Sequence, residues 1–158
     1  MFWGVVSRNG PVCLVKVTGV VEKLEIWGKI KTMDQYGYLD LLSAYLLPYL
    51  EEHPEAIFQQ DGASIHTSKV MMEFFTEFGC TPPSWPAKSP DLSVIENIWG
   101  LIKVALGKVN ILTVTDLEYW VPKLWDRIVT PELCKRLYDS IPVRIEAVFW
   151  NDGARISY

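Results

Sequence analysis

Two acidic residues, Asp61 and Glu96, place the strongest constraint on what this chain can fold into. Asp61 ends the run 56–61, which has the apolar start and the length of a β-strand, and the small residues Gly62 and Ala63 follow it. Glu96 lies three residues after Ser93, in the first turn of a predicted helix, and 34 residues separate the two carboxylates. Ligands of α/β proteins bind beyond the carboxyl ends of strands. The sequence therefore predicts an α/β fold that presents Asp61 on a strand and Glu96 on a helix.

Each carboxylate also has a simpler structural interpretation. Asp-Gly is a favoured turn pair, so Asp61 taken alone is typical of a turn after a strand. Ser93 and Glu96 have the spacing of a capping box, in which the glutamate accepts a hydrogen bond from the Ser93 amide. The two carboxylates indicate a shared role only together, through their flanking residues and the interval between them.

Five further residues near these carboxylates are candidates for shaping the site or contacting its substrate: His66, Thr67, Trp85, Lys88 and Asn97. A lone histidine after a turn is more often a hydrogen-bonded loop residue than a ligand. Trp85 lies in a proline-rich loop and could stack on a base, as aromatic side chains do in single-strand binders. Asn97 could orient Glu96 by contacting its carboxylate, or it could only face water.

The remaining pattern predicts a β-hairpin followed mainly by helices. Asn9-Gly10 beside Pro11 is a turn signal, and Gly79 is expected to end a helix at its C-terminal cap. The predicted elements are strands at 2–7, 12–17, 56–61 and around Thr81, and helices from Asp34 to about 50, at 69–78, from Ser93, at 117–128 with a capping box of Thr115 and Glu118, and from Pro131 and Pro142.

The composition is that of a globular chain of one domain. It has 158 residues, of which 49% are hydrophobic and 22% charged. No apolar run approaches the roughly 20 residues that cross a bilayer, so no membrane partner is expected. Three cysteines without CxxC spacing indicate reduced thiols rather than a zinc site. The net charge of −4 means that any DNA affinity must come from a metal, from geometry or from another segment.

The segments 58–67 and 85–99 resemble the DDE transposases of the mariner superfamily, the Tc/mariner type, and the resemblance extends over nearly the whole chain to the tail at 140–148. It implies an RNase H-like fold, a mixed five-stranded sheet flanked by helices. It also implies that Asp61 corresponds to the second catalytic aspartate and Glu96 to the third acid. His66 stands where the family has a histidine that shapes the site or contacts a phosphate.

The resemblance further implies cut-and-paste DNA transposition. In the family, DNA strands are nicked at the element's ends and joined to a target in the nucleus, by dimers or larger assemblies. Asp61 and Glu96 would hold Mg²⁺ or Mn²⁺ in a two-metal site. Such ions, about 4 Å apart, activate the attacking oxygen and stabilise the leaving one.

The sequence departs from the family in the first catalytic aspartate. In the family that residue lies on a strand preceding the one that contains Trp3 and Gly4, and this strand is expected to be absent from the 158 residues, as is the helix-turn-helix region that reads the element's ends. Asp34 and Asp40 fall on a predicted helix beyond the hairpin, so neither replaces it. The missing strand is central in the family's sheet, so two unpaired strand edges are expected where it would lie.

Three smaller departures concern single segments. Gly62 stands where the family usually has Asn, and Ser93-Val94 stands where it usually has Asn-Pro. The segment from Gly19 to Met33 is longer than the connection expected there.

Three functions are compatible with these features. The first is a transposase-derived DDE catalytic domain, partial over 1–158 and unable to transpose alone because one ligand is missing. The second is a domesticated, non-catalytic DNA-associated or protein-interaction module of the same fold, which Asp61→Ala would leave functional. The third is another RNase H-like nuclease whose third ligand comes from elsewhere in the chain; Asp61→Ala or Glu96→Ala would abolish its nicking.

Overall fold

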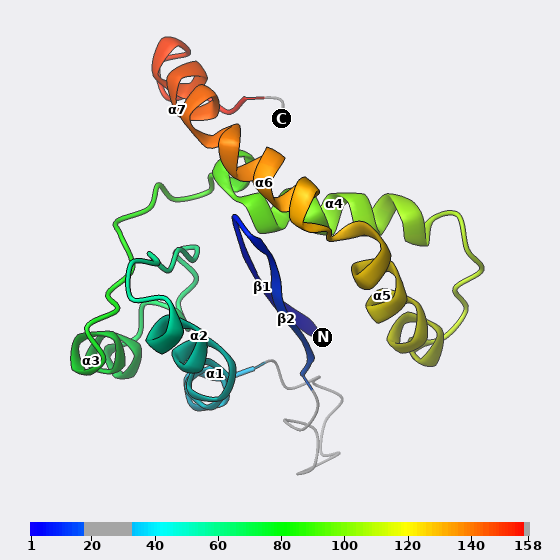
Figure 1. Ribbon diagram of the computed structural model, residues 1–158, viewed down its shortest axis with the longest axis horizontal. Helices are drawn as coiled ribbons and strands as arrows, with labels where there is room; N and C mark the ends of the chain where they lie inside the picture. Colours follow the sequence, from blue (N-terminus) through cyan, green and yellow to red (C-terminus); the bar gives the residue numbers. More distant parts are fainter. Residues whose placement is uncertain (18–32, 157–158) are drawn as a thin grey trace. The chain divides into compact units, whose positions relative to one another are not determined.

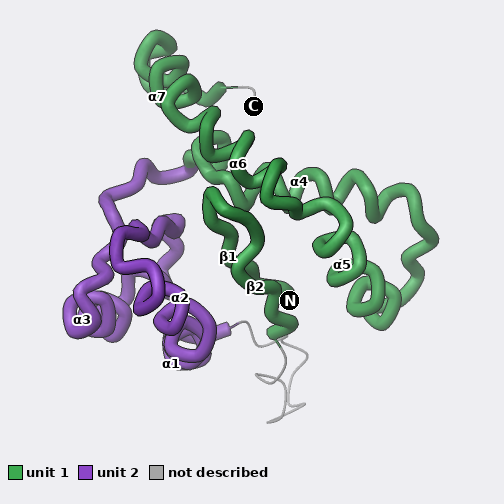
Figure 2. Tube along the Cα trace, in the orientation of Figure 1, with its two compact units in different colours: residues 1–17, 89–158 green, residues 18–88 purple. Residues whose placement is uncertain are grey.

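The computed structural model describes residues 1–17 and 33–156, which fall into two compact units. Unit 1 combines residues 1–17 with the C-terminal part from Ser89, and unit 2 lies between them in sequence and ends at Lys88 (Figure 2). The long segment from Gly19 lies outside the described residues, except for Met33 at its end. The boundaries predicted for a single partial catalytic domain over 1–158 stay a prediction.

The N-terminal hairpin of unit 1 is confirmed. Strand β1 (Phe2–Ser7) pairs antiparallel with β2 (Gly10–Lys16), with Phe2 opposite Lys16 and an irregularity between Val5 and Val6. Gly10 has φ +141°, a backbone conformation that favours glycine, and this explains how two residues suffice to reverse the chain.

Four α-helices and a 3₁₀ turn complete unit 1 (Figure 1). They are η2 (Pro90–Leu92), α4 (Val94–Leu106), α5 (Val114–Ile128), α6 (Pro131–Asp139) and α7 (Ile141–Trp150). As predicted, Pro131 and Pro142 lie in the first turns of their helices, where their missing N–H groups have no intrahelical acceptor. Ile98, Ile102, Trp125 and Cys134 are buried together in the core of the unit. Trp99 packs half-buried against this core, as its helical position predicted.

The start of α5 corrects the predicted capping box. The cap is Thr113 with Asp116, two residues earlier than the predicted Thr115 and Glu118. Asp116 Oδ2 accepts hydrogen bonds from the backbone N–H groups of Leu112 (2.9 Å) and Thr113 (2.8 Å), and the Asp116 N–H donates to Thr113 Oγ1 (3.1 Å). Thr113 and Thr115 are each followed by an acidic residue three positions later. The pair Thr113 and Asp116 has one advantage, because Asp116 also accepts a hydrogen bond from the backbone N–H of Leu112.

These bonds predict how stability depends on pH. They lower the pKa of Asp116 in the folded chain, through the Leu112 N–H first and then Thr113. A carboxyl with a lowered folded pKa contributes stability above its unfolded pKa of about 4, and this contribution is lost as pH falls through the folded value. Urea unfolding between pH 6 and 2.5 should therefore show a shallower acid loss for Asp116→Asn than for the wild type. Parallel curves would contradict this assignment.

Unit 2 is built on a bent helix and a second, shorter one. The bent helix consists of α1 (Gln35–Leu41), the π-helical segment η1 (Leu42–Leu46) and α2 (Leu47–Glu52). Asp34 caps it as predicted, by accepting a hydrogen bond from the Gly37 N–H (2.9 Å). Pro48 cannot donate to the carbonyl four residues earlier, and the π segment that directly precedes α2 accommodates this gap in the ladder.

Helix α3 (Lys69–Glu77) supplies the other half of the unit 2 core. Tyr38, Leu42 and Leu46 of the bent helix are buried, as are Met71 and Phe75 of α3. Gly79 follows the end of α3 with φ +64°, which confirms its predicted role at the C-terminal cap. One residue of the predicted apolar face, Phe78, is 49% exposed, so the buried face is narrower than expected.

The strands predicted at 56–61 and around Thr81 are corrected by the structure. Both segments lie outside any helix or strand. An extended segment becomes a strand only when a neighbour pairs with its backbone. Among the described residues, β1 and β2 pair only with each other.

Over the described ranges, no helix has both the length and the apolar character needed to cross a bilayer.

Candidate active site

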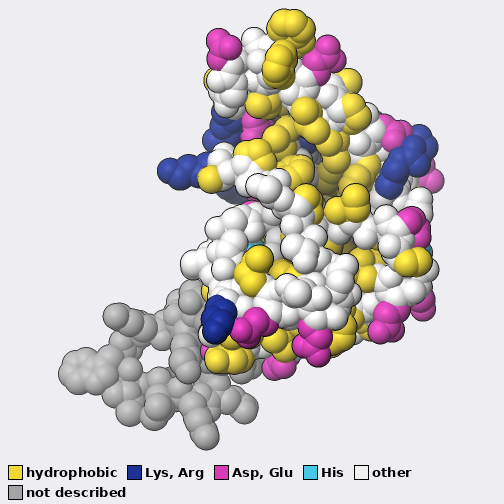
Figure 3. All heavy atoms as spheres, turned by 90° about the vertical axis from the view of Figure 1, so that its left-hand side faces the viewer, with side chains coloured by type: hydrophobic (Ala, Val, Ile, Leu, Met, Phe, Trp, Pro, Cys, Tyr) yellow, Lys and Arg dark blue, Asp and Glu magenta, His cyan; other side chains and the backbone are white. Residues whose placement is uncertain are grey.

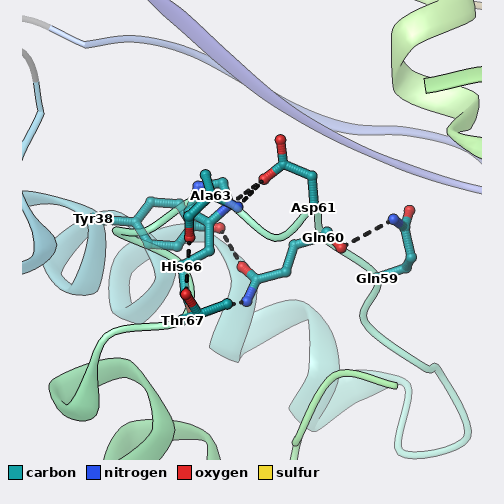
Figure 4. A network of polar contacts seen from close by, with 7 residues as sticks. All are labelled: Tyr38, Gln59, Gln60, Asp61, Ala63, His66 and Thr67. Atoms are coloured by element: carbon teal, nitrogen blue, oxygen red, sulfur yellow. Dashed lines mark hydrogen bonds and ion pairs between the residues drawn. The ribbon is translucent and has the colours of Figure 1, made fainter. Parts of the chain in front are cut away.

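The first candidate ligand, Asp61, lies in an exposed turn of unit 2. Its Oδ1 atom accepts a hydrogen bond from the Ala63 N–H (3.1 Å) and lies 2.7 Å from His66 Nδ1 (Figure 4). The turn interpretation of Asp61 is thus right for one of its oxygens. Within the described residues Oδ2 has no hydrogen-bond partner, and the side chain is 71% exposed. Asp61 can therefore serve as a turn residue and as a metal ligand at the same time.

His66 is held by a small network of side chains. Its ring stacks on Tyr38 with 4.4 Å between centroids, and the Tyr38 hydroxyl donates to Gln60 Oε1 (2.8 Å). Gln60 Nε2 in turn donates to the backbone carbonyl of His66 (3.3 Å) (Figure 4). An ionised carboxylate can only accept, so the hydrogen between His66 and Asp61 resides on Nδ1. The network thereby fixes the direction of one Asp61 oxygen and leaves the other exposed.

Thr67 is exposed and helps to shape the same turn. Its backbone N–H (3.1 Å) and its hydroxyl (3.3 Å) both donate to the Ala63 carbonyl. Ser68 then caps α3 by accepting from the Met71 N–H (3.4 Å). The turn after Asp61 is therefore stabilised by hydrogen bonds at its start, to Asp61, and at its end, from Thr67.

Trp85 and Lys88 lie at the end of unit 2 in the proline-rich loop. Trp85 is half-buried, and its indole Nε1 finds no acceptor among the described residues. Lys88 is exposed and has φ +56°, which is uncommon for a residue with a side chain. Stacking of Trp85 on DNA and contact of Lys88 with phosphate stay predictions.

The second candidate ligand, Glu96, is exposed in the first turn of α4 in unit 1. The capping-box interpretation is wrong, because Ser93 makes no side-chain cap bond and its N–H donates to the Pro90 carbonyl (3.1 Å). No described residue forms a hydrogen bond or ion pair with the Glu96 carboxylate. This carboxylate lies near the N-terminus of α4, the positive end of the helix dipole.

Asn97 does neither of the two things predicted for it. It neither contacts the Glu96 carboxylate nor simply faces water; its Oδ1 accepts a hydrogen bond from Arg144 Nη1. Arg144 is a residue that sequence reasoning missed. The only signal for it is a single arginine within the otherwise largely apolar helix α7.

The two carboxylates fit a hard divalent cation in kind. Both are exposed oxygen donors, the ligand type that Mg²⁺ and Mn²⁺ prefer, and Asp61 keeps one oxygen without a protein partner in the described ranges. The described residues contain no cluster of three His, Cys, Asp or Glu side chains that could hold a metal. Asp61 belongs to unit 2 and Glu96 to unit 1, so their joint ligation of a metal stays a prediction of the family resemblance.

A comparison with protein families shows the class of protein to which the chain belongs. The family described as DDE superfamily endonuclease matches residues 22–118, more than half of the chain. The chain therefore belongs to the DDE superfamily endonucleases.

Its similar curated proteins are nematode transposases. The Tc3 transposase of Caenorhabditis elegans is 32% identical over 141 residues, which cover 87% of this chain and 43% of that protein. The Tcb1 transposase of Caenorhabditis briggsae is 26% identical over 160 residues, which cover 100% of this chain and 54% of the Tcb1 protein. The predicted resemblance to Tc/mariner transposases is confirmed, and the chain spans about half the length of these relatives.

Solved structures confirm the predicted RNase H-like fold. The Mos1 transposase catalytic domain solved with Raltegravir and Mg superimposes with a TM-score of 0.74 at 18% sequence identity. That match covers 95% of this chain and 73% of the Mos1 chain. A crystal structure of the Mos1 mariner transposase catalytic domain gives a TM-score of 0.73.

Proposed function

We propose that this chain forms part of the catalytic domain of a metal-dependent DNA endonuclease that cuts and joins strands in cut-and-paste transposition. The observation that supports this most directly is the state of Asp61 and Glu96. Both lie in the segments that resemble the family's catalytic ones, and both carboxylates are exposed. The turn bonds of Asp61 use only one of its oxygens, and Glu96 does not take part in a capping box.

In this proposal Asp61 and Glu96 hold Mg²⁺ or Mn²⁺, and the family's first aspartate, on a strand before β1, supplies a further ligand. A bound pair of such ions supplies activation of the attacking oxygen and stabilisation of the leaving one. His66 Nδ1 holds one Asp61 oxygen and leaves the other available to a metal. The first turn of α4 presents Glu96 at the N-terminal end of the helix.

The substrate of this proposal is DNA, as transposon ends and as target, and the site of action is the nucleus. The net charge of −4 gives the chain little attraction for phosphates of its own. We therefore expect DNA affinity to depend on the metal and on segments beyond residues 1–158, and we propose a homodimer as the working form.

A plasmid assay tests the catalytic proposal. The protein is produced as residues 1–158 and, where the reading frame continues upstream, together with that segment, and is incubated with supercoiled plasmid and Mn²⁺ or Mg²⁺. We expect metal-dependent nicking, weak or absent for 1–158 alone. Asp61→Asn or Glu96→Gln should reduce it by more than about 100-fold, since even residues that only support a metal ligand change activity by about 10- to 100-fold.

Matched controls are the exposed carboxylates Glu77 and Asp126, which lie in α3 and α5, outside the segments that contain the two candidate ligands. Glu77→Gln and Asp126→Asn should nick as the wild type does. Nicking that survives Asp61→Asn and Glu96→Gln would refute the proposed roles. A longer form that folds and binds DNA but never nicks would favour the non-catalytic module instead.

A further inference from the structure

Helix α7 has an inverted pattern of burial. Its one buried residue is the charged Arg144, which is 0% exposed. Its apolar residues Phe149 and Trp150 are 72% and 75% exposed. Figure 3 shows hydrophobic side chains at the surface in the upper part of the view, where Figure 1 places α7. In this helix the arginine side chain is therefore buried while large hydrophobic side chains are exposed to solvent.

The Arg144 side chain holds both sides of the start of α4. Its Nη1 atom donates to the backbone carbonyl of Asp91 (2.9 Å), in the 3₁₀ turn just before the helix. The same Nη1 donates to Asn97 Oδ1, in the first turn of the helix itself. Its Nε donates to Ser140 Oγ (2.9 Å), which anchors the guanidinium at the start of α7.

The C-terminal segment closes this arrangement. The Asp91 carboxylate, which is itself buried, accepts a hydrogen bond from the Ile156 N–H (2.9 Å). The turn that precedes α4 is thus held by its carbonyl from α7 and by its side chain from the segment after α7. Both contacts come from residues more than 50 positions away in the chain.

We propose that Arg144 is a positioning residue for Glu96, an inference that rests on the metal-ligand role of Glu96 proposed above. Successive residues of an α-helix point about 100° apart, so fixing the side chain of Asn97 fixes the rotation of the first turn. Glu96 is the preceding residue on that turn, and its own carboxylate stays free of protein partners among the described residues. Arg144 therefore sets the direction of the Glu96 side chain without forming a hydrogen bond with its carboxylate.

The cost of burying Arg144 supports this role. A buried charge generally stabilises a fold no better than a hydrophobic side chain of similar size. A guanidinium, however, offers several donors in a rigid plane and can join two backbone segments at fixed angles. That property is useful where a helix start must be held in one orientation, as a metal-ligating residue requires.

Two readouts on four variants test the inference. Arg144→Lys keeps the positive charge but loses the planar guanidinium. Asn97→Ala removes one acceptor and leaves Arg144 its other hydrogen bonds. The third variant is Glu96→Gln, and the fourth, Arg136→Lys, is an exposed control on α6. Hydrogen exchange measures how well ordered the first turn of α4 is. Titration with Mn²⁺, followed by electron paramagnetic resonance, measures the affinity for the metal.

We expect Arg144→Lys and Asn97→Ala to speed exchange in the first turn of α4 about tenfold or more relative to α5, because each loses a hydrogen bond to a charged group. They should weaken Mn²⁺ binding about tenfold, as loss of a group supporting a ligand does. In the Glu96→Gln background neither change should weaken it further. Arg136→Lys should match the wild type in both readouts.

The failures are distinguishable. If Glu96→Gln weakens Mn²⁺ binding but Arg144→Lys and Asn97→Ala do not, the positioning role is overturned and the proposed function stands. Equal weakening by Arg144→Lys with and without Glu96 would also overturn it, because the effect would then be only on the fold. If Glu96→Gln binds Mn²⁺ as the wild type does, the ligand role in the proposed function is overturned, and the inference falls with it.

Discussion

Replacing Trp125 with alanine is expected to destabilise unit 1 by about 3–5 kcal/mol, the usual cost of deleting a buried tryptophan or phenylalanine ring. Trp125 is 3% exposed, and its ring centroid lies 5.5 Å from that of Trp99 on α4. A Cβ atom added to Gly4 would lie 2.7 Å from Trp125 Cη2, which shows how closely the indole approaches β1. Urea unfolding followed by far-ultraviolet circular dichroism measures the loss.

The matched control is Trp150→Ala. Trp150 is 75% exposed at the end of α7, so its removal should change stability by no more than about 0.5 kcal/mol. Similar losses for the two variants would contradict the assignment of Trp125 to the core.

The expected loss is large because total stabilities of domains are about 5–15 kcal/mol. Trp125 also joins three elements that unit 1 must hold together: the hairpin through Gly4, α4 through Trp99, and its own helix α5. Since α4 carries Glu96, the core around Trp125 is part of what keeps the second candidate ligand in place.

Elements defined by local signals could be predicted from the sequence. The hairpin, the Asp34 cap, the Gly79 helix end and the first-turn prolines each depend on residues within a few positions of one another. The capping box of α5 was misplaced by two residues because two threonines had equal spacing to an acid, and only the Leu112 N–H distinguishes them.

Features that depend on distant residues could not be predicted. The segment 56–61 has the composition of a strand, but a strand also needs a paired neighbour. Arg144 and Asn97 are 47 positions apart, and no local pattern indicates that they meet. A buried arginine is also against the usual preference for polar residues at the surface, so pattern reading places it in solvent.

The candidate site divides in the same way. Asp61 and His66 are five positions apart and contact each other, and the sequence had named both as candidate site residues. The support of His66 by Tyr38 crosses from a helix that precedes it by 28 positions, so only the structure reveals it. Residue types indicated the candidate ligands, whereas the residues that contact their segments could be found only from the three-dimensional structure.

A second large effect is expected in unit 2, where Phe75→Ala should cost about 3–5 kcal/mol and also loosen Asp61. Phe75 is 0% exposed, and its ring lies 6.0 Å from that of Phe58, three residues before Asp61. Segment 56–60 has no strand partner among the described residues, so its restraints include this ring contact and the hydrogen bonds of Gln60. Hydrogen exchange should become faster in α3 and over 57–63, and Mn²⁺ binding should weaken.

The control lies on the same helix. Phe78 is 49% exposed and contacts Phe74 rather than Phe58, so Phe78→Ala should lower stability much less and leave exchange over 57–63 unchanged. If Phe75→Ala destabilised α3 but left both exchange over 57–63 and Mn²⁺ binding at wild-type levels, Asp61 would be held by the His66 network alone. The ring packing of α3 would then be a matter of stability, separate from the site.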